Sequence, residues 1–98
     1  MTKSELIQAV SERQSIPKKR AEEIVNAMFA AMADALIDNR RIEVRGFGSF
    51  SIREYEARLG RNPRTNETVH VDAKRSVHFK VGKELRDLVS EASIELQP

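Results

Sequence analysis

The chain has 98 residues, a formal net charge of +2 and no cysteine, so disulfide bonds and thiolate metal sites are excluded. A single domain over residues 1–98 is expected, and a domain this small buries only a modest fraction of its surface, so association of two subunits would be a natural source of further burial. No run of about 18 apolar residues is present and no apolar signal segment follows the N-terminal residues, which predicts a soluble, cytoplasmic protein.

Two helices are predicted before Arg40. Thr2 followed three residues later by Glu5 is typical of a capping box, and the apolar residues that follow at helical spacing predict a short helix to about Arg13. Pro17 is well placed in the first turn of a second helix, which is predicted to run to residues 38–39. Apolar residues occupy most of the circumference of this second helix, and such a helix needs more cover than one small chain supplies. We therefore expect a dimer.

Strands and a final helix follow. Residues 41–45 alternate with period two, which predicts a strand with Ile42 and Val44 facing inward. Residues 46–48 are predicted to turn the chain, residues 49–59 and 68–73 to be extended, and residues 77–81 to return to the body. Gly82 ends this strand. Apolar residues at helical spacing then predict a helix from Lys83 to about Ala92, and residues 93–98 are expected to fray.

The stretch from Gly60 to Thr65 (GRNPRT) separates two extended segments and is rich in turn-forming residues. It predicts a β-ribbon arm at about residues 56–76. Such a ribbon is too thin and too polar to bury a core of its own. Its stability therefore has to come from the rest of the domain and from the ligand that it binds. A cationic ribbon with Pro63 as an apolar wedge at its end suits a nucleic-acid groove. The fold class predicted is α+β, with a helix-helix base, a three-stranded antiparallel sheet that extends into the arm, and a C-terminal helix.

Charge is segregated along the chain. Residues 1–39 carry five Lys or Arg against six acids, residues 40–86 carry twelve Lys or Arg against six acids, and residues 87–98 carry three acids alone. A basic middle between acidic ends indicates a localised surface for a polyanion.

Catalysis has little support in the sequence. His70 and His78 are the only histidines, and the acids are scattered over predicted helix faces, where solvated charge is their ordinary role. The two histidines lie on different predicted strands without a third ligand type nearby, so no metal site is expected. We therefore predict that the protein is not an enzyme and has neither a cofactor nor a small-molecule substrate.

Two further patterns allow more than one interpretation. Residues 45–52 (RGFGSFSI) half-match the RNA-recognition strand signature, but the fifth position is Ser49 rather than an aromatic residue, so Phe47 and Phe50 are interpreted as core residues closing the sheet over the second helix. Residues 18–20 (KKR) open the second helix, where the helix dipole disfavours cations. They are either a solvated corner balanced by nearby acids or a weak phosphate contact.

The motif Gly46 to Phe50 (GFGSF), followed at this spacing by Gly60 to Thr65, resembles the signature of the bacterial DNA-bending family of HU and integration host factor. The resemblance runs from Met1 to about Leu88, and the two motifs together are highly specific. Within the family, the stretches that look most like the β subunit of integration host factor are residues 1–7, 41–45, 78–80 and 82–87.

The resemblance implies an intertwined dimer whose helices form the base, with one arm per subunit reaching round double-stranded DNA. The second subunit would be either identical or a related α-type chain. Pro63 would intercalate at a kink, while Arg61, Asn62 and Arg64 would line the minor groove. Glu43 and Arg45 match positions that contribute to sequence preference in the β subunit. The remaining predicted DNA contacts are cations of the flanks and of the arm: Lys3, Arg53, Arg58, Lys74, Arg75, Lys80, Lys83 and Arg86.

One position departs from the family pattern. Asn66 stands where the family usually has glycine after the threonine. Because Asn also tolerates positive φ, the turn of the arm is expected to survive.

The function predicted is that of an architectural, histone-like protein of the bacterial nucleoid, which bends DNA and assists recombination, replication or transcription. Bending costs on the order of 1 to 6 kcal/mol, and neutralising phosphates along both flanks offsets that cost. An alternative from another class is a protein-interaction module that uses the arm for partner strands without nucleic acid. A membrane binder is disfavoured, because no helix joins a basic face to a large apolar one.

Overall fold

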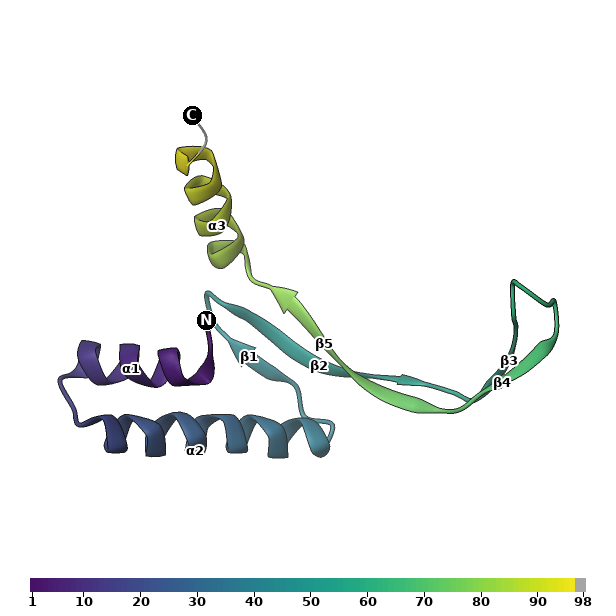
Figure 1. Cartoon of the computed structure of the whole chain (residues 1–98), viewed down its shortest axis with the longest axis horizontal. Coiled ribbons are helices and arrows are strands. Elements are labelled where there is room, and N and C mark those ends of the chain that lie inside the picture. Colours follow the sequence, from purple (N-terminus) through teal and green to yellow (C-terminus); the bar gives the residue numbers. More distant parts are fainter. Residues whose placement is uncertain (97–98) are drawn as a thin grey trace. The chain divides into compact units, whose positions relative to one another are not determined.

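The computed structural model describes residues 1–96. The elements in chain order are α1 (Lys3–Gln14), α2 (Lys18–Ile37), β1 (Ile42–Val44), β2 (Gly48–Tyr55), β3 (Arg58–Arg61), β4 (Thr68–Val71), β5 (Lys74–Val81) and α3 (Lys83–Leu96) (Figure 1). They form two compact units, one of residues 1–38 and one that begins at Asn39. The predicted α+β class is confirmed.

The helical unit begins with the predicted cap. The Thr2 side-chain oxygen accepts a hydrogen bond from the Glu5 N–H at 3.1 Å, which satisfies one of the donors left free at the start of α1. The helix ends at Ser15, whose φ of 52° lies in the left-handed region. Pro17 caps α2 from the position before its first helical residue, one place earlier than predicted, and its carbonyl accepts from the Ala21 N–H at 3.1 Å.

The core of the helical unit is small. Ile7, Ala21 and Val25 are its buried residues. Further along α2, Met28 is 59% exposed and Phe29 is also exposed, and both border an apolar pocket of about 90 Å³ between the two helices. As the sequence of α2 predicts, this helix has more apolar surface than α1 covers.

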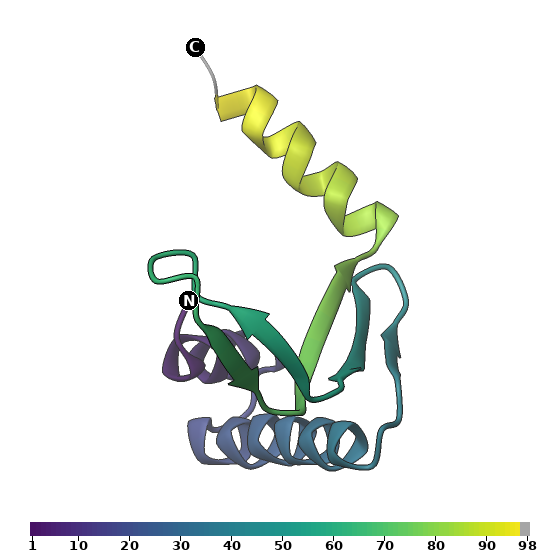
Figure 2. The same cartoon turned by 90° about the vertical axis from the view of Figure 1, so that its right-hand side faces the viewer.

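The second unit is built on an antiparallel sheet with the strand order β1-β2-β5. Its register pairs Gly48 with Val81 at one end and Tyr55 with Lys74 at the other. A second ribbon, β3 with β4, continues from that far end to form the arm (Figures 1 and 2). The predicted three-stranded sheet with a ribbon arm is therefore confirmed.

The two sides of the hairpin are divided at other positions than predicted, and residues 74–76, which the prediction left outside the strands, belong to β5. Both sides are interrupted at the same level, at residues 56–57 and at residues 72–73. These positions hold Glu-Ala and Asp-Ala, and acids and alanine are depleted in strands because they fill a pleated surface poorly. Two residues intervene on each strand, so the same register continues from the Tyr55–Lys74 pair to the Arg58–Val71 pair.

Three phenylalanines cluster where β1, β2 and β5 meet the turn at residues 45–47. The ring of Phe79 lies 4.8 Å from that of Phe50 and 5.9 Å from that of Phe47, measured between centroids, and both pairs are tilted. Phe50 is half-buried, but Phe47 remains 47% exposed, which is less burial than predicted for a core residue. Val44, predicted to face inward, is also exposed, so this unit keeps uncovered apolar surface of its own.

Helix α3 starts where Gly82 ends the sheet, as predicted, and the Arg86 N–H donates to the Gly82 carbonyl at 3.0 Å. It continues to Leu96 rather than stopping near Ala92, because no glycine or proline interrupts the sequence before Pro98. The predicted fraying at Gln97 and Pro98 lies outside the described residues. Leu88 and Val89 are exposed on this helix. None of the helices in the described part of the chain is long and apolar enough to cross a membrane.

Candidate nucleic-acid interface

The tip of the arm is a closed loop. The last ladder pair is Arg61 with Thr68. Beyond it, the Asn62 N–H donates to the Glu67 carbonyl at 2.9 Å, and the Asn66 N–H donates to the Asn62 carbonyl at 2.7 Å. Pro63 is exposed within this loop. The backbone that carries the proline is therefore held by main-chain hydrogen bonds, although the loop has no core of its own.

Side chains of the loop add to this order. The Asn62 Oδ1 accepts from the Arg64 N–H at 2.9 Å, and the Thr65 Oγ1 accepts from the Glu67 N–H at 3.4 Å, so both act as local turn-forming groups. Asn66 has a φ of 60°, the positive value that its residue type was expected to tolerate. Its Oδ1 accepts from the Arg61 Nη1 at 3.2 Å. Asn62 thus shapes the loop, a role that its predicted place in the groove did not include.

Cations predicted along the arm lie on both strands. Arg58 is exposed on β3, and Arg53 is exposed on β2. At the end of the β2·β5 ribbon, the Lys74 Nζ lies 5.5 Å from the centroid of the Tyr55 ring. Arg75 is tied to its surroundings, because its Nε lies 3.8 Å from a Glu54 carboxylate oxygen and its Nη2 donates to the Asn39 Oδ1. Its guanidinium is therefore shared with protein partners.

The opposite end of the sheet forms an open depression of about 450 Å³. Four of the predicted contact residues line it, namely Glu43, Arg45, Lys80 and Lys83. Arg86 is exposed one helical turn beyond Lys83 on α3, with its Nε 4.0 Å from Asp87. The structure thus brings together cations that are far apart in the sequence, because β1 and β5 both pair with β2 and β5 leads directly into α3.

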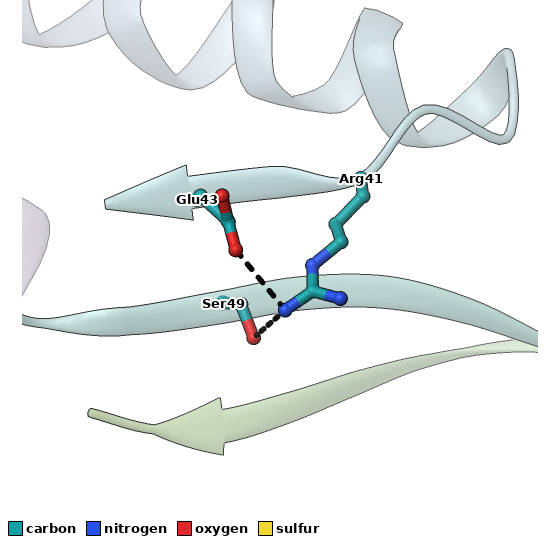
Figure 3. A network of polar contacts seen from close by, with 3 residues as sticks. All are labelled: Arg41, Glu43 and Ser49. Carbon is teal, nitrogen blue, oxygen red and sulfur yellow. Dashed lines mark hydrogen bonds and ion pairs between the residues drawn. The ribbon is translucent and has the colours of Figure 1, made fainter. Parts of the chain in front are cut away.

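Arg41 belongs to the same depression and was missing from the predicted set. Its Nη2 lies 3.2 Å from the Glu43 Oε1 and 3.4 Å from the Ser49 Oγ (Figure 3). Residues 41, 43 and 45 alternate with apolar residues at period two, which predicts that their side chains share one face, and this signal would have been sufficient to find Arg41. Glu43 therefore lies between two arginines and fixes the position of one of them.

Lys3 lies in the helical unit, as the first residue of α1, and is exposed. Among the side chains that the structure describes, those of residues 1–92, no group of three His, Cys, Asp or Glu could hold a metal ion. What the second unit offers is exposed cationic surface on the arm and around the depression. Such surfaces attract polyanions and suit a phosphate backbone better than a small ligand.

Comparison with known proteins adds a family relationship. Residues 1–90 match the family model described as bacterial DNA-binding protein. The integration host factor subunit beta of Marinomonas sp. (strain MWYL1) is 52% identical over 91 residues, which cover 92% of this chain and 89% of that protein. The same subunit of Serratia proteamaculans is 52% identical over 88 residues, covering 89% of this chain and 94% of that protein.

Solved structures show the same relationship. A chain in an Anabaena HU–DNA cocrystal structure is 40% identical, with a TM-score of 0.78 over 91% of this chain and 97% of that one. HU from Thermotoga maritima is 25% identical, with a TM-score of 0.63 over 91% of this chain and 98% of that one. The resemblance predicted from the motifs at residues 46–50 and 60–65 is confirmed.

Proposed function

Because this chain belongs to the bacterial DNA-binding protein family of HU and integration host factor, we propose that it binds the minor groove of double-stranded DNA and bends the duplex by inserting Pro63 at a kink. The chain is an architectural DNA-binding protein and not an enzyme. Minor-groove benders, HU and integration host factor among them, insert apolar side chains between base steps and so unstack them.

The observation that carries this proposal is the construction of the arm tip. Pro63 is exposed in a loop that main-chain and side-chain hydrogen bonds hold closed, between Arg61 and Arg64. A rigid apolar side chain can wedge between base pairs only if the loop behind it resists being pushed back. The two arginines supply the charge that brings the loop to the groove, and proline supplies no competing hydrogen-bond donor.

Bending is favoured by contacts on the flanks of the duplex. A smooth bend costs on the order of 1 to 6 kcal/mol. The cations around the depression, Arg45, Lys80 and Lys83, together with Arg86 and with Lys3 from the helical unit, would neutralise phosphates on DNA that curves back toward the body. Arg53, Arg58, Lys74 and Arg75 would extend this contact along the arm.

Glu43 is proposed to tune sequence preference. A carboxylate repels phosphate, so its place among cations needs a reason, and its contact with Arg41 supplies one. The pair holds one guanidinium in a defined position beside Arg45. A guanidinium held in one position contacts a groove of matching width better than a wider or narrower groove. Groove width depends on DNA sequence, so such a contact can favour some sequences without touching the bases.

Two subunits are proposed to form the functional unit, either identical or with a related α-type partner. The support is exposed apolar surface in both units, on Met28, Phe29, Phe47, Leu88 and Val89. Two arms, one from each subunit, would then hold the duplex from both sides. In the cell we place this dimer in the cytoplasm, on the bacterial nucleoid, where it would organise and condense DNA and assist recombination, replication or transcription.

A bending assay tests the function directly. The protein is titrated, at low and high salt, into a duplex that carries a donor dye at one end and an acceptor dye at the other. A duplex of about 35 base pairs is long enough for flanks on both sides of two kinks. Energy transfer should rise on binding, and affinity should fall steeply with salt. Arg45→Ala should weaken binding, whereas Arg13→Ala, which removes an exposed cation from the last turn of α1, serves as the charge-matched control. A chain that leaves the duplex unbound at low salt would favour the protein-interaction alternative.

A further inference from the structure

We propose that Asn66 is a positioning residue that orients the Arg61 guanidinium toward the minor groove before DNA is bound. This inference rests on the proposed DNA-binding function and refines it. Arg61 is the last residue of β3, and its exposed side chain would otherwise sample many rotamers. The hydrogen bond from its Nη1 to the Asn66 Oδ1, 3.2 Å long, limits that freedom across the mouth of the loop.

The backbone places Asn66 where it can do this. Its φ of 60° is in the left-handed region, and its N–H is bonded to the Asn62 carbonyl at 2.7 Å. Asn62 in turn is bonded through its own N–H to Glu67. These contacts fix the Cα of Asn66 relative to the end of β3, so its short side chain reaches the guanidinium without a flexible linker.

The chemistry of the two groups fixes the direction of the amide. A guanidinium has only donors, so the amide atom facing it has to be the oxygen. One of the five guanidinium N–H groups is then engaged by Asn66, and the others remain for acceptors on DNA. Holding the group in place beforehand reduces the conformational entropy that binding removes, and preorganisation of this kind raises affinity.

Arg64 provides an internal comparison. It lies in the same loop and is also exposed, but among residues 1–92 its side chain makes no hydrogen bond or ion pair; only its backbone N–H is bonded, to Asn62. Asn66 should therefore influence the contribution of Arg61 to DNA binding and leave that of Arg64 unchanged.

Glycine is the substitution that isolates the side chain. Asn66→Gly removes the acceptor and accepts positive φ more readily than Asn does, so the turn is retained. The test is a pair of double-mutant cycles on duplex affinity at fixed salt. One cycle combines Asn66→Gly with Arg61→Ala, and the other combines it with Arg64→Ala.

We expect Asn66→Gly to weaken binding about three-fold per arm, the size of an exposed interaction with a charged group. The same loss should appear in the Arg64→Ala background and vanish in the Arg61→Ala background. If Asn66→Gly lowers affinity equally in the parent, Arg61→Ala and Arg64→Ala backgrounds, Asn66 acts only through the turn. If it lowers affinity in none of them, Asn66 has no effect on binding. Either result overturns the positioning role.

A measurement without DNA separates this inference from the function itself. The Nε–H order parameter of Arg61 in the free protein should fall in Asn66→Gly, while that of Arg64 should stay the same. If the parent protein binds and bends the duplex but Arg61 is equally mobile in both proteins, the positioning role is wrong and the function stands. If the parent does not bind duplex DNA, both are wrong.

Discussion

Gly48 lies directly against the ring of Phe79. A Cβ on Gly48 would lie 2.7 Å from two carbons of that ring and 2.6 Å from the Lys80 carbonyl oxygen, closer than side-chain carbons approach such atoms. The close approach lets the Phe79 ring cover the start of β2, where it meets Phe47 and Phe50. Glycine is needed here for space rather than for an unusual backbone angle.

Gly48→Ala should therefore lower the free energy of unfolding by about 1–3 kcal/mol, because either the ring or the β5 backbone has to move. Denaturant unfolding at one fixed protein concentration measures this change. Gly60→Ala is the matched control, since a Cβ there would meet nothing closer than the Val71 Cγ2 at 3.5 Å. We expect the control to stay within about 0.5 kcal/mol of the parent. Equal losses for the two variants would rule out the ring contact as the cause.

The small buried core predicts that folding depends on a second subunit. Only Ile7, Ala21 and Val25 are buried within the described part of the chain. We expect light scattering to give the mass of a dimer at micromolar concentration, and the midpoint of thermal unfolding to rise with protein concentration. Phe29→Lys, which places a charge on the exposed apolar side of α2, should shift the chain toward the unfolded state. A folded monomer with a concentration-independent midpoint would contradict the dimer.

Salt dependence tests how far DNA wraps the body. The proposed phosphate contacts outside the arm are Lys3, Arg45, Lys80, Lys83 and Arg86. In two subunits they make roughly ten contacts. A plot of the logarithm of the binding constant against the logarithm of the salt concentration should therefore have a slope of about −9. Lys80→Ala should make the slope shallower by about 2, since it removes one contact from each subunit. A parent slope shallower than about −3 would indicate contact by the arms alone.

Pro63→Ala should reduce bending more than affinity. Proline is proposed to act by unstacking a base step, at a local cost of a few kcal/mol, whereas the charges of Arg61 and Arg64 survive the substitution. The double variant with Arg61→Ala and Arg64→Ala should do the reverse and weaken binding to all sequences. End-to-end energy transfer at saturating protein, measured beside an affinity titration, separates the two effects. If the Pro63→Ala complex holds the duplex ends as close together as the parent does, proline only shapes the turn.

Local patterns in the sequence predicted most of the fold. The spacing of Thr2 and Glu5 predicted the cap of α1, and Gly82 predicted the junction of β5 with α3; the structure confirms both. These features depend on residues that are neighbours in the chain. The interruptions at residues 56–57 and 72–73 were missed because apolar alternation continues past them, although their residue types pack poorly in a strand.

The candidate site was harder to predict, since its details depend on which residues the fold brings together. The charge pattern pointed to the basic middle of the chain, but the contact of Arg41 with Ser49 exists only because β1 and β2 pair. The hydrogen bond between Arg61 and Asn66 likewise requires the loop to be closed by Asn62 and Glu67. Sequence indicated that Asn66 could adopt positive φ, and the structure adds what its side chain reaches from there.

The unbroken register of the hairpin has a consequence for how the chain folds. Pairing Gly48 with Val81 closes a much longer loop than pairing Arg61 with Thr68, and the entropy lost on closure grows with loop length. We therefore expect the tip to close first and the strands to zip from it toward the body. A slip of one residue at the tip would place the Phe50 and Phe79 rings, which now share a face, on opposite faces of the sheet. The loop proposed to meet DNA thus also sets the alignment of strands at the far end of the unit, so mutations in it should change folding rates as well as DNA binding.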